Sequence, residues 1–277
     1  MELATFAPND SSLKANQLAQ RAVAALKREA EFTPKPGLVD GRGNGAHEDM
    51  DLELLMKSAD SLYSTFLEIA QVSHQHPINQ ELREKIAMIG RQGEAKMLTA
   101  TNGVNTHKGA IWIIGLLVSV IASNGNRENP MVSLSLAGEL ASYPDRYQPM
   151  KKIISNGEKV SAEYGVMGAL MEAQQGFPHM KKGLAYALRH KNADRLDEIE
   201  KLTVFLLVVS VVEDTCILHR GTWQDLIKIQ DLAKQALQAP LPNLPFIQLD
   251  TYCRKHRLSP GGSADLFAAI LFLVEGT

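Results

Sequence analysis

Acidic and basic side chains are concentrated in a glycine-rich segment near the start of the chain, from Thr33 to Asp51. Its two prolines and four glycines exclude a regular helix or strand. Carboxylates mixed with Lys35 and Arg42 are typical of a loop that binds a phosphorylated ligand together with a divalent cation. A solvated surface loop is the alternative for this segment taken alone.

A second polar segment, Gly93 to Trp112, ends at the start of an apolar run. Exposed backbone N–H groups at a helix start, with Lys108 beside them, form a favourable phosphate site. The alternative is that Asn105 and Thr106 only cap the helix while His107 and Lys108 face water.

A third segment, Val211 to Trp223, places Glu213 and Asp214 after a very apolar helix. An acid near the C-terminal end of a helix is unfavourable, and a bound cation or Arg220 would relieve that cost. A structural ion pair between Asp214 and Arg220 is the alternative.

A fourth segment, Ser259 to Leu273, opens an apolar helix with two glycines followed by Asp265. An acid in the first turn of a helix is favourable by itself. The same position also suits a carboxylate directed into a cleft. The apolar run predicts a helix surrounded by protein.

The composition of the chain argues against several classes of function. The 277 residues include 29 Lys and Arg against 31 Asp and Glu, so no global basic field favours nucleic acid. Apolar runs are shorter than the roughly 20 residues that span a bilayer. The two cysteines form no metal or disulfide framework, and the N-terminus does not resemble a signal peptide. We therefore expect a cytoplasmic protein with small-molecule ligands.

Helical periodicity dominates the chain. Apolar residues recur at intervals of three and four over 13–30, 52–69, 82–98, 196–212 and 226–237. Asp51 or Asp49 is placed to cap the second of these helices. The proline-rich stretch Ala239 to Phe246 is expected to join two helices. The prediction is an all-α fold, one catalytic domain over residues 1–277 with 1–12 flexible, and motif-bearing loops that form one cleft.

Dinucleotide, Walker, kinase, nucleophile-elbow and HExxH motifs are absent. The four segments in this order instead resemble the triphosphoribosyl-dephospho-coenzyme A synthase family. The resemblance is carried by TPKPGLVD with NGAHEDMD, then GVNTHKGAI, EDTCILHRG and SPGGSADL; YGVMGALMEAQQGFP resembles a fifth block. Cys216 and Thr222 depart from the family pattern, which has a polar residue, often Asn, and a glycine there.

The resemblance implies a glycosyl transfer. ATP loses adenine, and its C1′ is joined to the 2′-hydroxyl of 3′-dephospho-coenzyme A, which gives the prosthetic-group precursor of malonate decarboxylase or citrate lyase. The triphosphate is kept as a handle, while carboxylates manage an oxocarbenium-like centre. The form of the first block favours the malonate decarboxylase branch.

Roles follow from the resemblance together with residue chemistry. Glu94 or Asp265 is the candidate general base for the 2′-hydroxyl, and the other acid orients ribose or protonates adenine. The candidate Mg²⁺ ligands are Asp49, Asp51 and Asp214, and we expect turnover to depend on Asp49 and Asp214. The candidate substrate-binding residues are Lys35, Arg42, Asn44, His47, Asn105, His107, Lys108 and Arg220.

Two other classes remain open at this stage. One is a magnesium-dependent all-α hydrolase of phosphorylated or ADP-ribosylated substrates, and the other is a non-catalytic carrier of coenzyme A derivatives. A binder of anionic ligands gains nothing from nearby carboxylates, which argues against the carrier. An exposed apolar helix would also be compatible with a homodimer.

Overall fold

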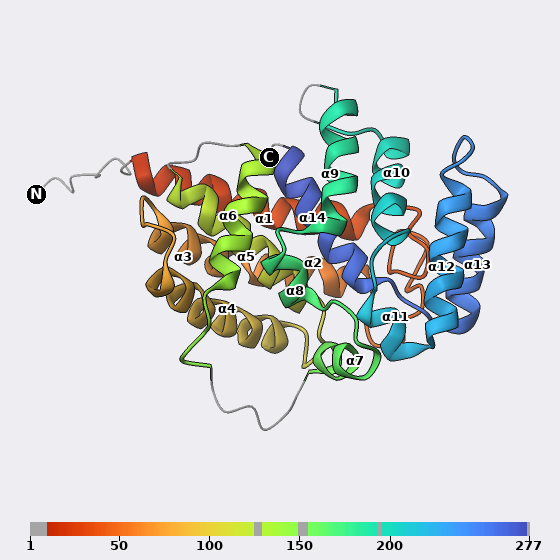
Figure 1. Cartoon of the computed structure of the whole chain (residues 1–277), viewed down its shortest axis with the longest axis horizontal. Helices are drawn as coiled ribbons and strands as arrows, with labels where there is room; N and C mark the ends of the chain where they lie inside the picture. Colours follow the sequence, from red (N-terminus) through yellow and green to blue (C-terminus); the bar gives the residue numbers. More distant parts are fainter. Residues whose placement is uncertain (1–9, 125–128, 149–154, 193–194, 276–277) are drawn as a thin grey trace, which may run out of the picture.

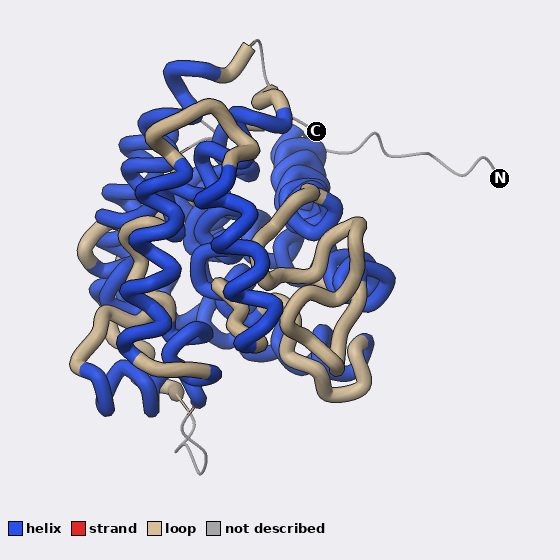
Figure 2. Tube along the Cα trace, turned by 90° about the vertical axis from the view of Figure 1, so that its right-hand side faces the viewer, coloured by secondary structure: helices blue, strands red, loops and turns tan. Residues whose placement is uncertain are grey.

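A computed structural model of the chain describes residues 10–124, 129–148, 155–192 and 195–275. Within these ranges the regular structure is helical, with isolated β-bridges and no strand (Figures 1 and 2). The helices are α1 (Asp10–Glu31), α2 (Leu52–Ser61), α3 (Tyr63–Ser73), α4 (Gln80–Ala100), α5 (Lys108–Ser123), α6 (Pro130–Ser142), α7 (Asn156–Tyr164), α8 (Ala169–Gln174), α9 (Pro178–His190), α10 (Glu198–Val209), α11 (Thr215–Arg220), α12 (Trp223–Ala236), α13 (Leu244–His256) and α14 (Gly261–Val274). The all-α prediction is confirmed.

The expected flexible segment, residues 1–12, lies mostly outside the described residues. Asp10 to Ser12 are described, and they form the start of α1. Among the residues that the structure describes, no helix has the length and apolar character needed to cross a membrane.

Helices α5 and α14 form the centre of the hydrophobic core. Every residue of α5 from Ile113 to Ala122 is buried, as is every residue of α14 from Leu266 to Val274. The two helices pack against each other, and α1 contacts both (Figure 1). Helix α5 is also covered by α3, α4 and α6, and α14 by α9 and α10. A helix that is apolar on all sides requires such enclosure, as expected for the helix that follows Ser259.

Polar side chains fix where several helices begin. Asp51 caps α2 by accepting the Leu54 N–H at 2.8 Å, so the capping residue is Asp51 and not Asp49. Asn79 caps α4 in the same way, with the Leu82 N–H at 2.9 Å. Side-chain oxygens at these positions satisfy backbone donors that have no partner inside the helix.

Two predicted helix boundaries were wrong. The periodic stretch from Leu52 to Ile69 is divided at Leu62 into α2 and α3, and the Ser61 hydroxyl donates back to the Ser58 carbonyl just before the break. Helix α10 ends at Val209 instead of Val212. The proline-rich stretch joins α12 to α13, as predicted.

The glycine-rich segment between α1 and α2 is held against the C-terminal part of the chain. Arg42 pairs with Asp250 of α13 at 2.8 Å. Gly37 has a φ of +71°, and an added Cβ would lie 2.7 Å from the Cys253 Cβ. Gly37 is therefore required both by its backbone conformation and by close packing on α13.

Candidate active site

The N-termini of α5 and α14 meet around the Asp265 carboxyl. This half-buried group accepts the Ala110 N–H in the first turn of α5, and it lies close enough to Glu29 and Asp214 to feel both carboxylates. Burial is the main cause that raises its pKa well above the usual range, and the two neighbouring acids add to it. Burial and the neighbouring acids therefore favour the protonated form of this carboxyl group, the form that can donate a proton.

Asp214 lies near Asp265 and contacts the first residues of two helices, α11 and α14. It is 1% exposed and caps α11 by accepting the Cys216 N–H at 2.9 Å. It also accepts the Gly262 N–H at 3.2 Å, and the Ser263 N–H and hydroxyl at 2.8 Å each. Burial raises the pKa of Asp214, while these donors oppose the rise.

The sequence placed Asp214 at the unfavourable end of a helix, and the structure corrects this. The chain leaves α10 at Val209 and begins α11 at Thr215, so Asp214 lies at the positive N-terminal end of α11. Backbone and hydroxyl donors supply the compensation that a cation or Arg220 was expected to provide.

Lys35 is directed inward and not toward a ligand. It is 1% exposed, and its ammonium contacts the Glu29 carboxylate at 2.7 Å and the carbonyls of Glu29 and Ala30. The three ammonium N–H groups therefore have partners inside the protein. In this conformation a phosphate would reach Lys35 only if the pair with Glu29 opened.

His107 is also enclosed, at the start of α5. Its Nδ1 lies 2.7 Å from the Ser58 hydroxyl, which lies 2.6 Å from the Thr106 hydroxyl. The buried Nε2 has no hydrogen-bond partner among the described residues. Burial, aided by the positive charge of Lys35, lowers the pKa of His107 to about 4, so the imidazole is neutral at physiological pH.

Glu94 and Asp265 lie on either side of the α5 N-terminus. Glu94 of α4 forms an ion pair with Lys108 at 2.5 Å. Lys108 is followed by Gly109, the residue against which the Asp265 carboxylate packs. Asn105 accepts the Lys108 N–H at 3.3 Å. The first turn of α5 thus lies between the two candidate proton-transfer groups, Glu94 and Asp265.

His47 connects the first segment to the third and fourth. Its Nε2 lies 2.8 Å from the Ser259 hydroxyl, and its Nδ1 lies 3.2 Å from the exposed Arg220 guanidinium. Asp49 is 3.6 Å from the same Nδ1. Burial and the charge of Arg220 lower the pKa of His47, and Asp49 opposes them.

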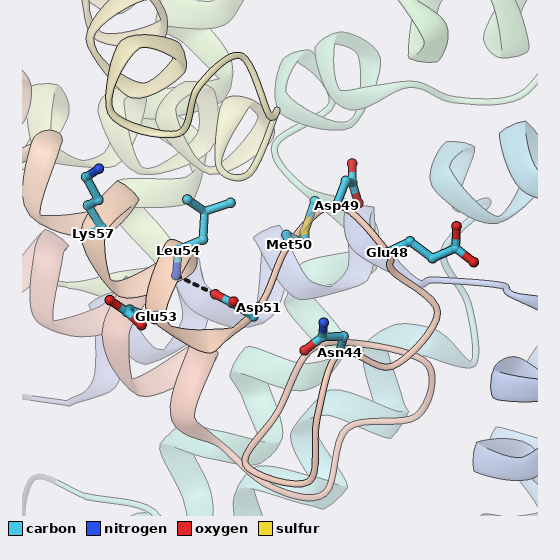
Figure 3. Close-up of a pocket in the computed structure, with 8 residues that line it drawn as sticks. All are labelled: Asn44, Glu48, Asp49, Met50, Asp51, Glu53, Leu54 and Lys57. Carbon is cyan, nitrogen blue, oxygen red and sulfur yellow. Dashed lines mark hydrogen bonds between the residues drawn. The ribbon is translucent and has the colours of Figure 1, made fainter.

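A pocket of about 320 Å³ is lined by residues of the first segment and of α2 (Figure 3). Asp51 turns toward the Leu54 N–H, while Asp49 projects from the preceding loop (Figure 3). The lining residues are Asn44, Glu48, Asp49, Met50, Asp51, Glu53, Leu54 and Lys57. The second, third and fourth segments do not line this pocket, so one cleft shared by all the segments stays a prediction.

The candidate metal ligands are not brought together. Asp49 is exposed, Asp51 caps α2, and Asp214 is buried among its donors. Within the described ranges no group of three or more His, Cys, Asp or Glu side chains could hold a metal ion. A Mg²⁺ ion that arrives with a triphosphate needs only one or two carboxylates, so Asp49 fits that mode of binding.

Residues 15–277 match the model of the ATP:dephospho-CoA triphosphoribosyl transferase family. The chain belongs to this family. A 2-(5''-triphosphoribosyl)-3'-dephosphocoenzyme-A synthase from Klebsiella pneumoniae is 40% identical over 97% of both chains. A probable synthase of that name from Pseudomonas syringae pv. syringae is 40% identical over 99% of this chain and 95% of its own. No solved structure matches.

Membership of the triphosphoribosyl transferase family agrees with the convergence of the sequence segments. Asp265 and Gly109 bring the fourth and second segments together, and Asp214 adds the third. The fifth segment joins through Glu213, which accepts the Met167 N–H at 3.0 Å. Whether each residue contacts a substrate stays a prediction.

The two departures from the family pattern have local explanations in this transferase. Thr222 caps α12, and a reciprocal contact with Asp225 completes a capping box. Cys216 packs against Gly261, where an added Cβ would lie 3.0 Å from its sulfur, and burial raises the pKa of this thiol. Both cysteines are free thiols, and Cys216 is held in its unreactive protonated form.

Sequence reasoning missed three residues of this cluster. Glu29 lies in a helix whose periodicity was recognised, and a charge on its buried face was the available signal. Gly109 lies within the second segment but carries no chemistry of its own. Ser58 gave no signal, because only the fold places its hydroxyl beside His107.

The burial of the His107 imidazole can be tested through the pH dependence of stability. Its folded pKa of about 4 is below the unfolded value of about 6.5. Between these values the unfolded chain binds more protons, so His107 should reduce stability as pH falls from about 6.5 to 4, by at most about 1.4 kcal/mol per pH unit. Urea unfolding of wild type and His107→Asn across this range should show a steeper loss for wild type. Parallel curves would contradict a neutral, buried imidazole.

Proposed function

We infer that this chain transfers the triphosphoribosyl group of ATP to the 2′-hydroxyl of 3′-dephospho-coenzyme A and releases adenine. The C1′–N9 bond of ATP breaks and a C1′–O2′ bond forms. The proton lost by the hydroxyl balances the proton gained by adenine. Family membership supports the reaction, and the position of the Asp265 carboxyl group against Gly109 at the α5 N-terminus is the structural observation that carries the chemistry.

The environments of the two acids divide the proton transfers between them. Burial and its acidic neighbours raise the pKa of Asp265 and favour its protonated form, so it is suited to protonate the departing adenine. Glu94 is a carboxylate paired with Lys108, and it is suited to accept the proton of the 2′-hydroxyl.

The exposed cations and the residues of the first segment would have different roles in substrate binding. Lys108 and Arg220 are exposed near the two helix starts, and they would hold triphosphate oxygens. Mg²⁺ would enter bound to ATP as part of the substrate, with Asp49 as its protein contact. Asn44 and His47 would contact ribose or base beside that ion.

The test is incubation of the purified protein with ATP, Mg²⁺ and 3′-dephospho-coenzyme A, followed by mass spectrometry. Adenine and the triphosphoribosyl adduct should appear together, and chelation of Mg²⁺ should abolish both. Adenine or phosphate without adduct would favour the hydrolase. Ligand binding without turnover would favour the carrier.

The acceptor pathway, cellular location and oligomeric state are further expectations. The first block supports the malonate decarboxylase branch, and mass spectrometry of the acyl carrier proteins in the source cell would show which one carries the prosthetic group.

Two free thiols are compatible with the cytoplasm, which fractionation tests. Exposed Ile227, Leu244 and Ile247 are compatible with a homodimer, which sedimentation of the purified protein tests.

A further inference from the structure

Gly109 lies in the first turn of α5, where the Asp265 carboxylate packs directly against it. A Cβ built on Gly109 would overlap the Asp265 Oδ2 and lie 2.9 Å from its Cγ. The nearest atoms within 4 Å of that Cβ all belong to the Asp265 carboxyl group. Any side chain at position 109 therefore competes with the carboxylate for the same space.

The position of Asp265 depends on this close approach. One of its carboxyl oxygens accepts the N–H of Ala110, the residue after Gly109, so the group lies at the positive end of α5. His107, the residue before the helix, forms no capping hydrogen bond through its side chain. Asp265 thus supplies from α14 a second side-chain acceptor at the start of α5, in addition to Asn105, which accepts the Lys108 N–H.

Glycine is not required at position 109 by backbone conformation. Its φ lies outside the range of +20° to +160°, and the residue is within a regular helix. Alanine has a higher helix propensity than glycine. The missing side chain is therefore best explained by the space that the Asp265 carboxylate fills.

We propose that Gly109 is a positioning residue for the transfer reaction: the absence of a side chain there admits the Asp265 carboxyl group to the α5 N-terminus, the position from which it reaches the reacting groups. This inference rests on the proton-donating role proposed above for Asp265. Gly109 itself contributes no functional group. It acts only by determining where the Asp265 side chain can lie.

The test compares Gly109→Ala with Gly90→Ala, a control in the middle of α4 where an added Cβ meets nothing within 4 Å. Adduct formation gives kcat and the KM of each substrate, and thermal unfolding gives the melting temperature. Gly109→Ala should lower kcat about 100-fold with unchanged KM values, since a misplaced acid loses general acid catalysis but not ground-state binding. Gly90→Ala should behave as wild type.

A second pair of variants separates the carboxylate from other effects of the methyl group. In an Asp265→Ala background the space is free, so adding Gly109→Ala should change neither kcat nor melting temperature further. Wild-type kcat for Gly109→Ala, or an equal additional loss in both backgrounds, would overturn the proposal. Absence of adduct with the wild-type protein would instead overturn the proposed function.

Discussion

Asp265→Asn is expected to lower the rate of adduct formation about 100-fold to 10,000-fold, the contribution typical of a general acid. The amide retains an oxygen that can accept the Ala110 N–H, so the contact with α5 should persist. It has no proton to donate to adenine. Stopped assays of adenine release should therefore show the loss in kcat, while ATP binding by calorimetry stays near that of wild type.

A control distinguishes this catalytic effect from an effect on helix capping. Asp265→Ala removes the acceptor as well as the acid, so it should also reduce the melting temperature, whereas Asp265→Asn should reduce it less. Near-normal turnover by Asp265→Asn would leave Asp265 as a cap of α5 and would move the search for the acid to Glu94.

Lys35→Met is expected to destabilise the fold by about 3–5 kcal/mol, because it leaves the Glu29 carboxylate buried without its cation. Glu29 also lies near Asp265, so the uncompensated charge would lie beside another acid. Urea unfolding monitored by circular dichroism gives the free energy of unfolding directly.

An exposed lysine in the second segment supplies the matched control. Lys108→Met breaks the partly exposed pair with Glu94, which should cost at most about 1 kcal/mol. Replacing both members of the buried pair, with Lys35→Met and Glu29→Leu together, should recover part of the loss. Unchanged stability of Lys35→Met with a raised KM for ATP would restore Lys35 as a phosphate ligand.

The sequence alone determined the fold class and the identity of the chemical segments. Three-and-four spacing requires helices, and residues 111–122 and 266–273 are too apolar to lie anywhere except the core. The family resemblance was recognised from short sequence blocks and their order, which can be read along the chain without a structure. These features are local or additive along the sequence, and no knowledge of long-range contacts was needed to recognise them.

Only the tertiary structure decided what each charged residue faces. Lys35 and Arg220 are both cations in glycine-rich surroundings, yet one is enclosed by Glu29 and the other is exposed beside His47. Asp214 and Asp265 are both helix-start acids, yet Asp214 also accepts the Ser263 N–H of α14, and Asp265 accepts the Ala110 N–H of α5. The protonation state and accessibility of a side chain depend on neighbours distant in sequence, because burial and nearby charge set the energy of its ionised form.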